Sequence, residues 1–341
     1  MKPRDILVAT HGHCFDGLAS AVLFTRFYRA LASDATLSFR YKSCGYGPRM
    51  QMIPEGWLDG DESAILDFRY TPSAKVSWYF DHHITGFATP AERDAALATA
   101  AAANAAALAA SADGGVAGAR PQVFYEPTYG SCAKLIADVA AARFGVDMSP
   151  LAELVAWADI IDTARFPSAE AATAPDEPVL QLAAVIEHHG DGKFLKEFAP
   201  LLLDRPLAEI AASEGIQARW APIRAAREAF VRRVESKAEV RGHVVLVDLT
   251  DAPLEVAAKF ATYARFPACT YSVMLSRNKQ HFKLSIGYNP WSGAPRLHDI
   301  ASICRRYNGG GHPAVGACSF PLSAIESAKE AARTVVAELE G

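Results

Sequence analysis

Residues 76–86 read VSWYFDHHITG, and this stretch decides the fold. Residues 76–80 are mainly β-branched and aromatic, so they predict a short strand. The triplet Asp81-His82-His83 follows where that strand ends. Burying a carboxylate and two imidazoles together is unfavourable unless they bind something, and a divalent cation suits both ligand types. An ordinary polar turn is the alternative interpretation of the triplet alone.

The segments before the triplet predict an α/β domain. Strands are expected at residues 6–10, 37–42 and 64–66, with a helix at 18–31 after the first of them. Strands mixed with helices favour a mainly parallel sheet. His11, Asp67 and Asp81 each come directly after an expected strand. Because ligands of open α/β sheets bind beyond the carboxyl ends of the strands, we expect these three side chains to share a site.

Composition limits the classes of function. The chain has 341 residues, of which 50% are hydrophobic and 21% are charged, which is typical of a globular protein with room for two domains. The net charge of -4 argues against binding to long duplex nucleic acid, but it is compatible with a small anionic substrate. Six cysteines without a CxxC pair favour a reducing compartment. With no signal peptide or membrane-spanning stretch, we expect a cytoplasmic protein.

Two segments in the middle of the first half carry weaker signals. Alanine dominates residues 95–112, and we interpret 94–119 as a surface insertion without catalytic residues. Ser131 precedes another expected helix. It would either cap that helix or help to bind an anion there, and the sequence favours capping.

A helix is expected at about 150–163, and it contains Asp159 and Asp162. Because the two aspartates are three residues apart, both face one side of the helix. They would form either an exposed edge or a metal-ligand face, and the spacing does not decide between these. His188 and His189 form a second histidine pair, which we interpret as a helix C-terminus rather than a metal site.

The composition changes near residue 242, which predicts a second domain. Its expected helices cover residues 254–264, 297–307 and 324–339. The segment NGGGHPAVGACSF follows the second of these helices. Three consecutive glycines can cap a helix, or they can let backbone N–H groups approach a phosphate, with His312 as an added donor. We favour the anion-binding interpretation, because a cap needs fewer glycines. Arg305 on the preceding helix would either supply charge or face solvent.

Taken in order, these segments resemble the DHH phosphoesterase family. The segment HGHCFDGLAS is similar to the first family motif, AILDF to the second, DHH to the third, and the helix with Asp159 and Asp162 to the fourth. GGGHPAVGA resembles the signature of the DHH-associated C-terminal domain, so the matches run from residue 6 to about 320. The resemblance implies an α/β catalytic domain at 1–190, a helical linker at 191–240 and a substrate-binding domain at 241–341.

The resemblance also implies a role for individual residues. The family binds two divalent cations, usually Mn²⁺, although Mg²⁺ or Co²⁺ would also suit such a site. The implied ligands are His11, Asp16, Asp67, His82 and one of Asp159 or Asp162. Asp67 would bridge both cations, while Asp81 and His83 would shape the site or assist the leaving group. The implied substrate contacts are Ser285, Arg305, Gly309, Gly310, Gly311 and His312.

The first motif departs from the usual family pattern. Cys14 stands where the family has the first of two aspartates, and His11 is out by one position, with His13 as a substitute. This form resembles a sub-branch whose first motif reads His-x-x-Cys-x-Asp-Gly and which includes short-RNA exonucleases. A thiolate at residue 14 would favour softer metals than Mg²⁺. A neutral thiol would leave one cation weakly held.

The expected function is hydrolysis of very short RNA or dinucleotides to mononucleotides, as in 3′–5′ exoribonucleases, with water activated by two cations. The first alternative is hydrolysis of another small nucleotide, such as 3′-phosphoadenosine 5′-phosphate or a cyclic dinucleotide. The second is a nucleotide-binding regulator with a degenerate metal site. Long duplex nucleic acid and membranes are not expected partners, and a homodimer is compatible with the sequence.

Overall fold

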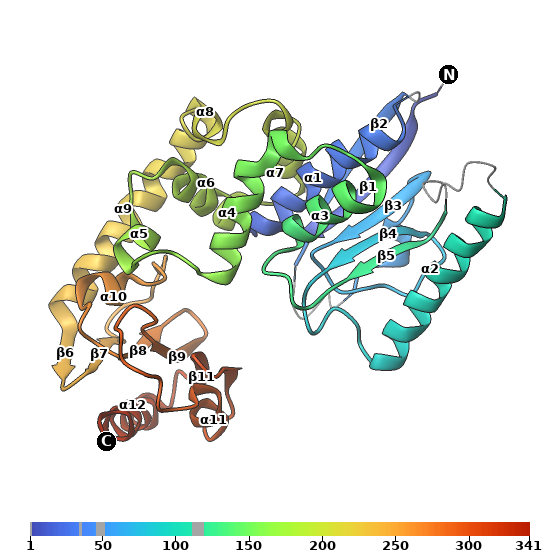
Figure 1. Ribbon diagram of the computed structural model, residues 1–341. Coiled ribbons are helices and arrows are strands. Elements are labelled where there is room, and N and C mark those ends of the chain that lie inside the picture. Colours follow the sequence, from blue (N-terminus) through green and yellow to red (C-terminus); the bar gives the residue numbers. More distant parts are fainter. Residues whose placement is uncertain (1, 34–35, 46–51, 111–118) are drawn as a thin grey trace. The chain divides into compact units, whose positions relative to one another are not determined.

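The structure is a computed structural model that describes residues 2–33, 36–45, 52–110 and 119–341 (Figure 1). The chain forms two compact units. Unit 1 comprises Met1–Arg165 and Gln181–Gln217, and unit 2 comprises Phe166–Leu180 and Ala218–Gly341. The segment expected to be a linker, 191–240, is therefore divided between the units, because helix α9 (Glu214–Lys237) begins in unit 1 and ends in unit 2.

Unit 1 contains a parallel sheet of five strands, in the order β2-β1-β3-β4-β5. The strands are β1 (Arg4–His11), β2 (Leu37–Cys44), β3 (Glu62–Leu66), β4 (Val76–Asp81) and β5 (Gln122–Tyr125). Thr10 of β1 pairs with Leu66 of β3, which in turn pairs with Phe80 of β4. This register brings the carboxyl ends of the three strands to one edge, and it confirms the α/β fold with a parallel sheet that the sequence predicts.

Helices surround this sheet in unit 1. They are α1 (Phe15–Leu31), α2 (Pro90–Ala110), α3 (Cys132–Phe144), α4 (Ala152–Thr163), α7 (Gly192–Phe198), α8 (Leu207–Ala211) and most of α6 (Pro178–His189), which begins at the end of a unit 2 segment; 3-10 turns lie at Glu55–Trp57, Ser149–Leu151 and Leu201–Leu203. Helix α1 is buried over most of its length, and Phe24 packs edge-on against Phe27, Trp78 and Phe80. Ser131 caps α3 as expected, because its hydroxyl accepts a hydrogen bond from Lys134 N at 3.2 Å.

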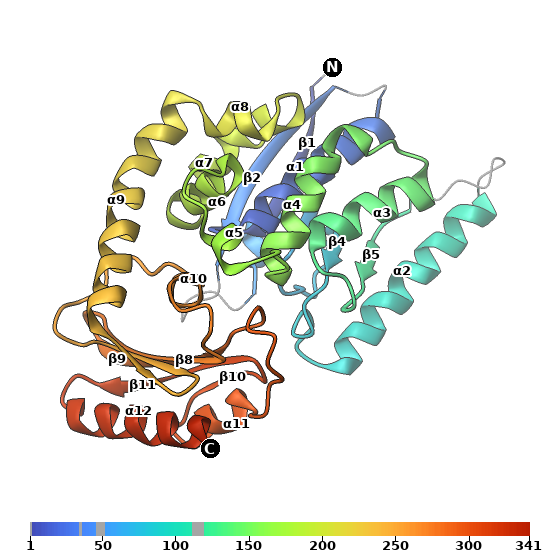
Figure 2. The same cartoon turned by 60° about the vertical axis from the view of Figure 1, so that its left-hand side comes forward.

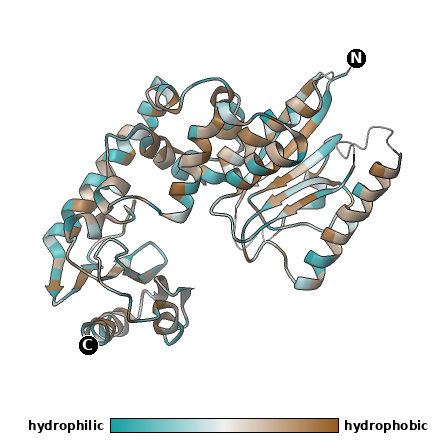
Figure 3. Cartoon of the chain, in the orientation of Figure 1, coloured by the Kyte–Doolittle hydropathy of each residue, from teal (hydrophilic) through white to brown (hydrophobic). Residues whose placement is uncertain are grey.

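The alanine-rich segment forms helix α2, which contributes Ala96 and Ala100 to a buried cluster of unit 1. Residues 111–118 of the expected insertion lie outside the described residues. Figure 3 shows α2 and the neighbouring strands in largely hydrophobic colours. In the part of the chain that the structure describes, no helix is both long and apolar enough to cross a membrane.

Unit 2 contains a six-stranded sheet in the order β10-β11-β9-β8-β7-β6, in which only β7 and β8 pair in parallel. Its strands are β6 (Ala238–Arg241), β7 (Val244–Leu249), β8 (Tyr271–Arg277), β9 (His281–Tyr288), β10 (Gly310–His312) and β11 (Val315–Pro321). Its remaining helices are α5 (Ala169–Thr173), α10 (Ala261–Arg265), α11 (Ile300–Arg305) and α12 (Ile325–Glu340). Figure 2 shows α12 along this sheet, where Val335 and Leu339 enter the core.

Two expected helices of unit 2 are shorter than predicted. The helix expected at 254–264 is wrong for most of its length, since only α10 at its end is helical. Leu254 N instead donates to Arg277 O at 2.8 Å, and Phe260 adopts a left-handed backbone with φ 66°. The helix expected at 297–307 is confined to α11, because the Asp299 side chain caps it by accepting from Ser302 N.

Candidate metal centre

Asp67 lies at the centre of a cluster formed where the parallel strands end. His11 is the last residue of β1, Asp67 directly follows β3, and Asp81 is the last residue of β4. The Asp67 backbone is left-handed, with φ 53°, which is uncommon for any residue but glycine. Its side chain is 1% exposed, and neither carboxylate oxygen has a hydrogen-bond partner among the described residues. A buried carboxylate in this state fits a bound cation.

Three imidazoles face the Asp67 carboxylate. His11 Nδ1 lies 3.6 Å from Oδ2, while His82 Nε2 and His83 Nδ1 each lie 3.6 Å from Oδ1. These distances are too long for good hydrogen bonds. Two ligand atoms that each lie about 2.1 Å from one cation, at an angle near 115°, are about 3.5 Å apart. For His11 and His82 the spacing therefore fits ligands that share a cation with Asp67, one at each carboxylate oxygen, whereas His83 Nδ1 lies closer to Asp81, at 2.8 Å.

A second group surrounds His82 Nε2. This atom lies 3.7 Å from Asp16 Oδ2 and 3.5 Å from Asp162 Oδ2. His82 Nδ1 lies 3.1 Å from the carbonyl oxygen of Tyr129. Because a carbonyl oxygen only accepts, Nδ1 must donate, and a neutral His82 then presents the lone pair of Nε2 to the carboxylates.

Asp16 is held in place by the beginning of helix α3. Its carboxylate accepts hydrogen bonds from Cys132 N at 2.7 Å and from Ala133 N at 2.9 Å. The carboxylate is thereby oriented before any cation arrives. Gly17 beside it cannot carry a side chain without a local shift, because a Cβ there would lie 2.0 Å from the carbonyl oxygen of His11.

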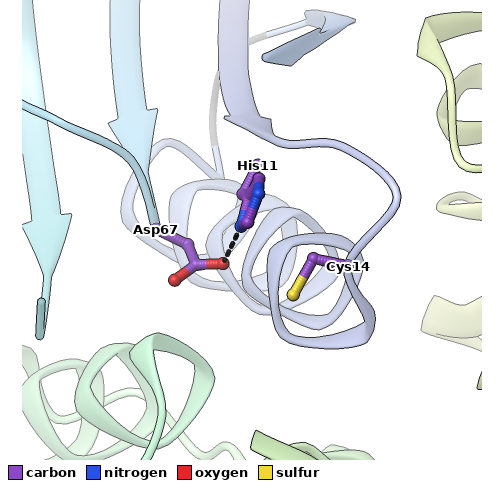
Figure 4. A group of neighbouring side chains, drawn as sticks. All are labelled: His11, Cys14 and Asp67. Carbon is purple, nitrogen blue, oxygen red and sulfur yellow. Dashed lines mark ion pairs between the residues drawn. The ribbon is translucent and has the colours of Figure 1, made fainter. Parts of the chain in front are cut away.

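The third group consists of His11, Cys14 and Asp67 (Figure 4). One ligand atom from each of these side chains lies within 4.8 Å of the other two. Cys14 precedes helix α1 and is partly exposed. Asp67 belongs both to this group and to the group with His82 and His83, as a bridging carboxylate would.

The carboxylates of Asp16, Asp67 and Asp162 lie close together, and their mutual repulsion favours a positive charge between them. Burial favours the neutral form of Asp67, but the imidazoles of His11 and His82 outweigh it and lower the pKa to about 2. Burial opposes the charged form of His82 too, yet Asp67 and Asp16 raise its pKa to about 9. Burial and the Asp67 charge raise the pKa of the Cys14 thiol, and they act in the same direction on Asp16. The electrostatics of the cluster therefore favour a positive charge beside Asp67 and Asp16, which a bound cation would supply.

Asp81 orients the imidazole of His83 by a hydrogen bond. Its Oδ1 lies 2.8 Å from His83 Nδ1, and its Oδ2 accepts from the Tyr79 hydroxyl at 3.0 Å. Asp81 is fully buried, so both oxygens are engaged within the protein. Gly86 leaves room for this arrangement, because a Cβ there would lie 2.1 Å from Asp81 Oδ2. Nε2 of His83 points away from Asp81, and the His83 side chain is 32% exposed.

The structure separates the residues that the sequence left as alternatives. Asp162 faces the cluster, whereas Asp159 lies 3.9 Å from the guanidinium of Arg165. His11 joins the cluster, whereas His13 Nδ1 lies 3.2 Å from the carbonyl oxygen of Glu187. The histidine pair His188-His189 ends helix α6, as the sequence predicts.

Sequence reasoning missed two tyrosines that support the cluster. Tyr79 lies two residues before Asp81 on β4, so the two side chains share one face of the sheet. This alternation was the signal that would have identified Tyr79. Tyr129 acts through its backbone carbonyl, and no feature of the sequence marks it.

The expected substrate residues all lie in unit 2. Ser285 is on β9, where it pairs with Met274 and Ala317. Gly310–His312 form strand β10 rather than an open loop, and Gly309 N donates to Cys304 O at 2.9 Å. A Cβ on Gly309 would lie 2.3 Å from Ala317 O, and a Cβ on Gly311 would lie 2.3 Å from Val315 O. Close pairing with β11 thus accounts for these two glycines, while Arg305 ends α11 and faces solvent.

No family model and no curated protein matches this chain. Among solved structures, a pGpG-specific phosphodiesterase, PggH from Vibrio cholerae, aligns with a TM-score of 0.67 and 16% identity over 98% of this chain and 99% of that one. The DHH domain of a member of the s1p family of ribosomal proteins gives 0.56 and 14% over 99% and 88%. Exonuclease RecJ bound to manganese gives 0.50 and 17% over 98% and 90%. These similarities show that the chain has the fold of DHH-domain proteins.

Proposed function

We propose that the protein is a metal-dependent phosphodiesterase that hydrolyses very short RNA or linear dinucleotides to mononucleotides. The observation that carries this proposal is the convergence of His11, Asp67 and His82 from three strand ends, around a buried carboxylate without hydrogen-bond partners. A carboxylate that only stabilises the core is normally satisfied by hydrogen bonds. A buried carboxylate without them therefore indicates a metal site rather than a structural ion pair.

The solved relatives support the substrate class. PggH is described as specific for pGpG, a linear dinucleotide, and RecJ as an exonuclease. Alignment with PggH covers 98% of this chain and 99% of that one, so the shared fold extends over both units of this chain. The net charge of -4 favours a small substrate over a long duplex. Binding of the substrate by Ser285 and by the stretch Gly309, Gly310, Gly311 and His312 is part of the proposal, with Arg305 as an added cation.

The donor set fits two divalent cations, for which Mn²⁺ is our first choice. His11, Cys14 and Asp67 would hold one of them, and Asp16, His82, Asp67 and Asp162 would hold the other. Such cations polarise a phosphate oxygen and make a bound water nucleophilic at neutral pH.

The residues of the chain supply orientation and a proton. Asp67 would share its two oxygens between the cation positions, and the Tyr129 carbonyl would keep Nε2 of His82 aimed at them. His83, held through Nδ1 by Asp81, has Nε2 left to give a proton to the leaving oxygen. Tyr79 fixes Asp81 from the other side.

A hydrolysis panel tests the proposal. It would contain pGpG, RNA dimers to pentamers, a longer RNA, a cyclic dinucleotide and 3′-phosphoadenosine 5′-phosphate, each with Mn²⁺ and with a chelator. We expect Mn²⁺-dependent release of mononucleotides from the linear dinucleotides and the shortest RNAs. Preference for the cyclic dinucleotide or the bisphosphorylated adenosine would replace the proposed substrate, and binding without hydrolysis would favour a regulator.

The Asp67→Asn variant tests the role of the cluster. Asparagine tolerates the left-handed backbone of residue 67, so the loop keeps its shape while the charge is removed. We expect turnover to fall at least about 1,000-fold, as for loss of a main transition-state contact. Asp204→Asn, an exposed aspartate of unit 1, is the matched control and should be unaffected. Equal turnover in the two variants would remove Asp67 from the mechanism.

A further inference from the structure

We infer that Cys14 binds the first cation as a thiolate, so that this position selects a thiophilic divalent cation such as Co²⁺, Zn²⁺ or Fe²⁺ over Mg²⁺. The inference rests on the proposed metal centre and assigns the chemistry of one of its two positions. It concerns the group formed by His11, Cys14 and Asp67, which we call the thiol position.

The placement of Cys14 is the first observation. It occupies the position before helix α1 with an extended backbone (φ -130°, ψ 135°), yet its side chain makes no capping hydrogen bond. The sulfur is instead part of the thiol position, within 4.8 Å of the ligand atoms of His11 and Asp67. Figure 4 shows the three side chains beside one another, with His11 at the end of β1, Cys14 on the connection from β1 to α1 and Asp67 on the segment after β3.

The Asp67 carboxylate is the second, independent observation. It is 1% exposed, and its Oδ2 faces His11 without a hydrogen-bond partner in the described residues. A thiol is a weak donor and would satisfy this oxygen poorly. A cation bound by the imidazole, the carboxylate and the sulfur would satisfy all three groups at once.

The other cysteines show what a structural cysteine of this chain looks like. Cys44, Cys132, Cys269, Cys304 and Cys318 are all buried, whereas Cys14 is partly exposed. Cys132 also lies near Asp16, but its sulfur is 3.3 Å from the Phe80 carbonyl oxygen, to which it donates. Cys14 is thus the cysteine that an incoming ion can reach.

The chemistry of binding is a simple exchange. The S–H bond of Cys14 breaks, a sulfur–metal bond forms, and the proton passes to solvent. His11, Asp67 and Cys14 would supply one nitrogen, one oxygen and one sulfur ligand, which are donor types that also hold catalytic zinc ions. Thiolate sulfur raises affinity for Co²⁺, Zn²⁺ and Fe²⁺ far more than for Mg²⁺, which prefers oxygen ligands.

Cobalt substitution of the protein tests the inference, because thiolate-bound Co²⁺ has a near-ultraviolet charge-transfer band that oxygen or nitrogen ligands do not produce. The metal-free protein would be titrated with Co²⁺, and the absorption spectrum and the bound Co²⁺ per chain would be recorded. We expect the band in the wild type and in Cys269→Ala, a buried control in unit 2. We expect it to be absent in Cys14→Ser and in Cys14→Asp.

The outcomes separate this inference from the proposed function. Co²⁺ binding without the band in the wild type, or a band that survives in Cys14→Ser, would overturn the thiolate and leave the metal centre standing. Absence of Co²⁺ binding in the wild type would overturn both. Competition adds a readout that does not depend on cobalt. Cys14→Asp should lower the preference for Zn²⁺ over Mg²⁺ by at least about tenfold, and an unchanged preference would contradict the inference.

Discussion

Adding a methyl group at residue 86 should break the hydrogen bond by which Asp81 orients His83. In the Gly86→Ala variant the added Cβ would lie 2.1 Å from Asp81 Oδ2 and 2.9 Å from the Tyr79 hydroxyl. Real Cβ contacts are almost never under 3.0 Å, so the carboxylate must retreat. The retreat of about 1 Å would carry Oδ1 away from His83 Nδ1, and a misplacement of about 1 Å in a catalytic group can lower turnover about 100-fold.

The assay is Mn²⁺-dependent hydrolysis of pGpG at saturating metal and substrate, with thermal unfolding measured in parallel. Gly56→Ala is the matched control, because no described heavy atom outside its local stretch of backbone lies within 4 Å of the added methyl group. We expect Gly86→Ala to lose about 100-fold in kcat while Gly56→Ala keeps full activity. If a folded Gly86→Ala protein turned over at the rate of Gly56→Ala, Asp81 would not position His83 for the reaction.

Two further predictions concern stability. Ser131→Ala should lower the free energy of unfolding by about 1 kcal/mol, because the Lys134 N–H loses its acceptor. Urea denaturation measures this difference, and an unchanged midpoint would show that Ser131 does not stabilise α3 as a cap. Burial raises the pKa of Glu62, but Arg120 outweighs it, so the net pKa is lowered. Its contribution is therefore present above the unfolded pKa of about 4.3 and is lost as pH falls through the folded pKa. Glu62→Gln should be about 2 kcal/mol less stable at neutral pH, and a deficit that stayed constant during acidification would contradict this.

The parallel sheet and the strand-end residues were predictable from the sequence because their signals are local. A buried strand shows as an apolar run, and the residue after it marks the sheet edge. This reasoning placed His11, Asp67 and Asp81 at one edge, where the structure also has them. The cap at Ser131 is local in the same way.

Features that depend on distant contacts were not predictable. Asp159 and Asp162 have the same helical signal, and only the placement of α4 beside His82 distinguishes them. The helix expected from residue 254 fails because Leu254 N finds its acceptor on Arg277, at the end of β8. Gly309 and Gly311 are required by the close pairing with β11, because its carbonyl oxygens leave no room for a Cβ at either residue.

The left-handed backbone of residue 67, directly after β3, limits which amino acids can occupy this position without strain. Glycine, asparagine and aspartate take up that backbone conformation with the least strain, and of these only aspartate carries a charge. Residue 67 must adopt a left-handed backbone and, in the proposed metal centre, must also bind a cation, and aspartate meets both requirements. A related protein that has lost the activity but kept the fold should therefore have asparagine or glycine at the position of residue 67. Either residue at that position would indicate a protein without the metal-dependent reaction.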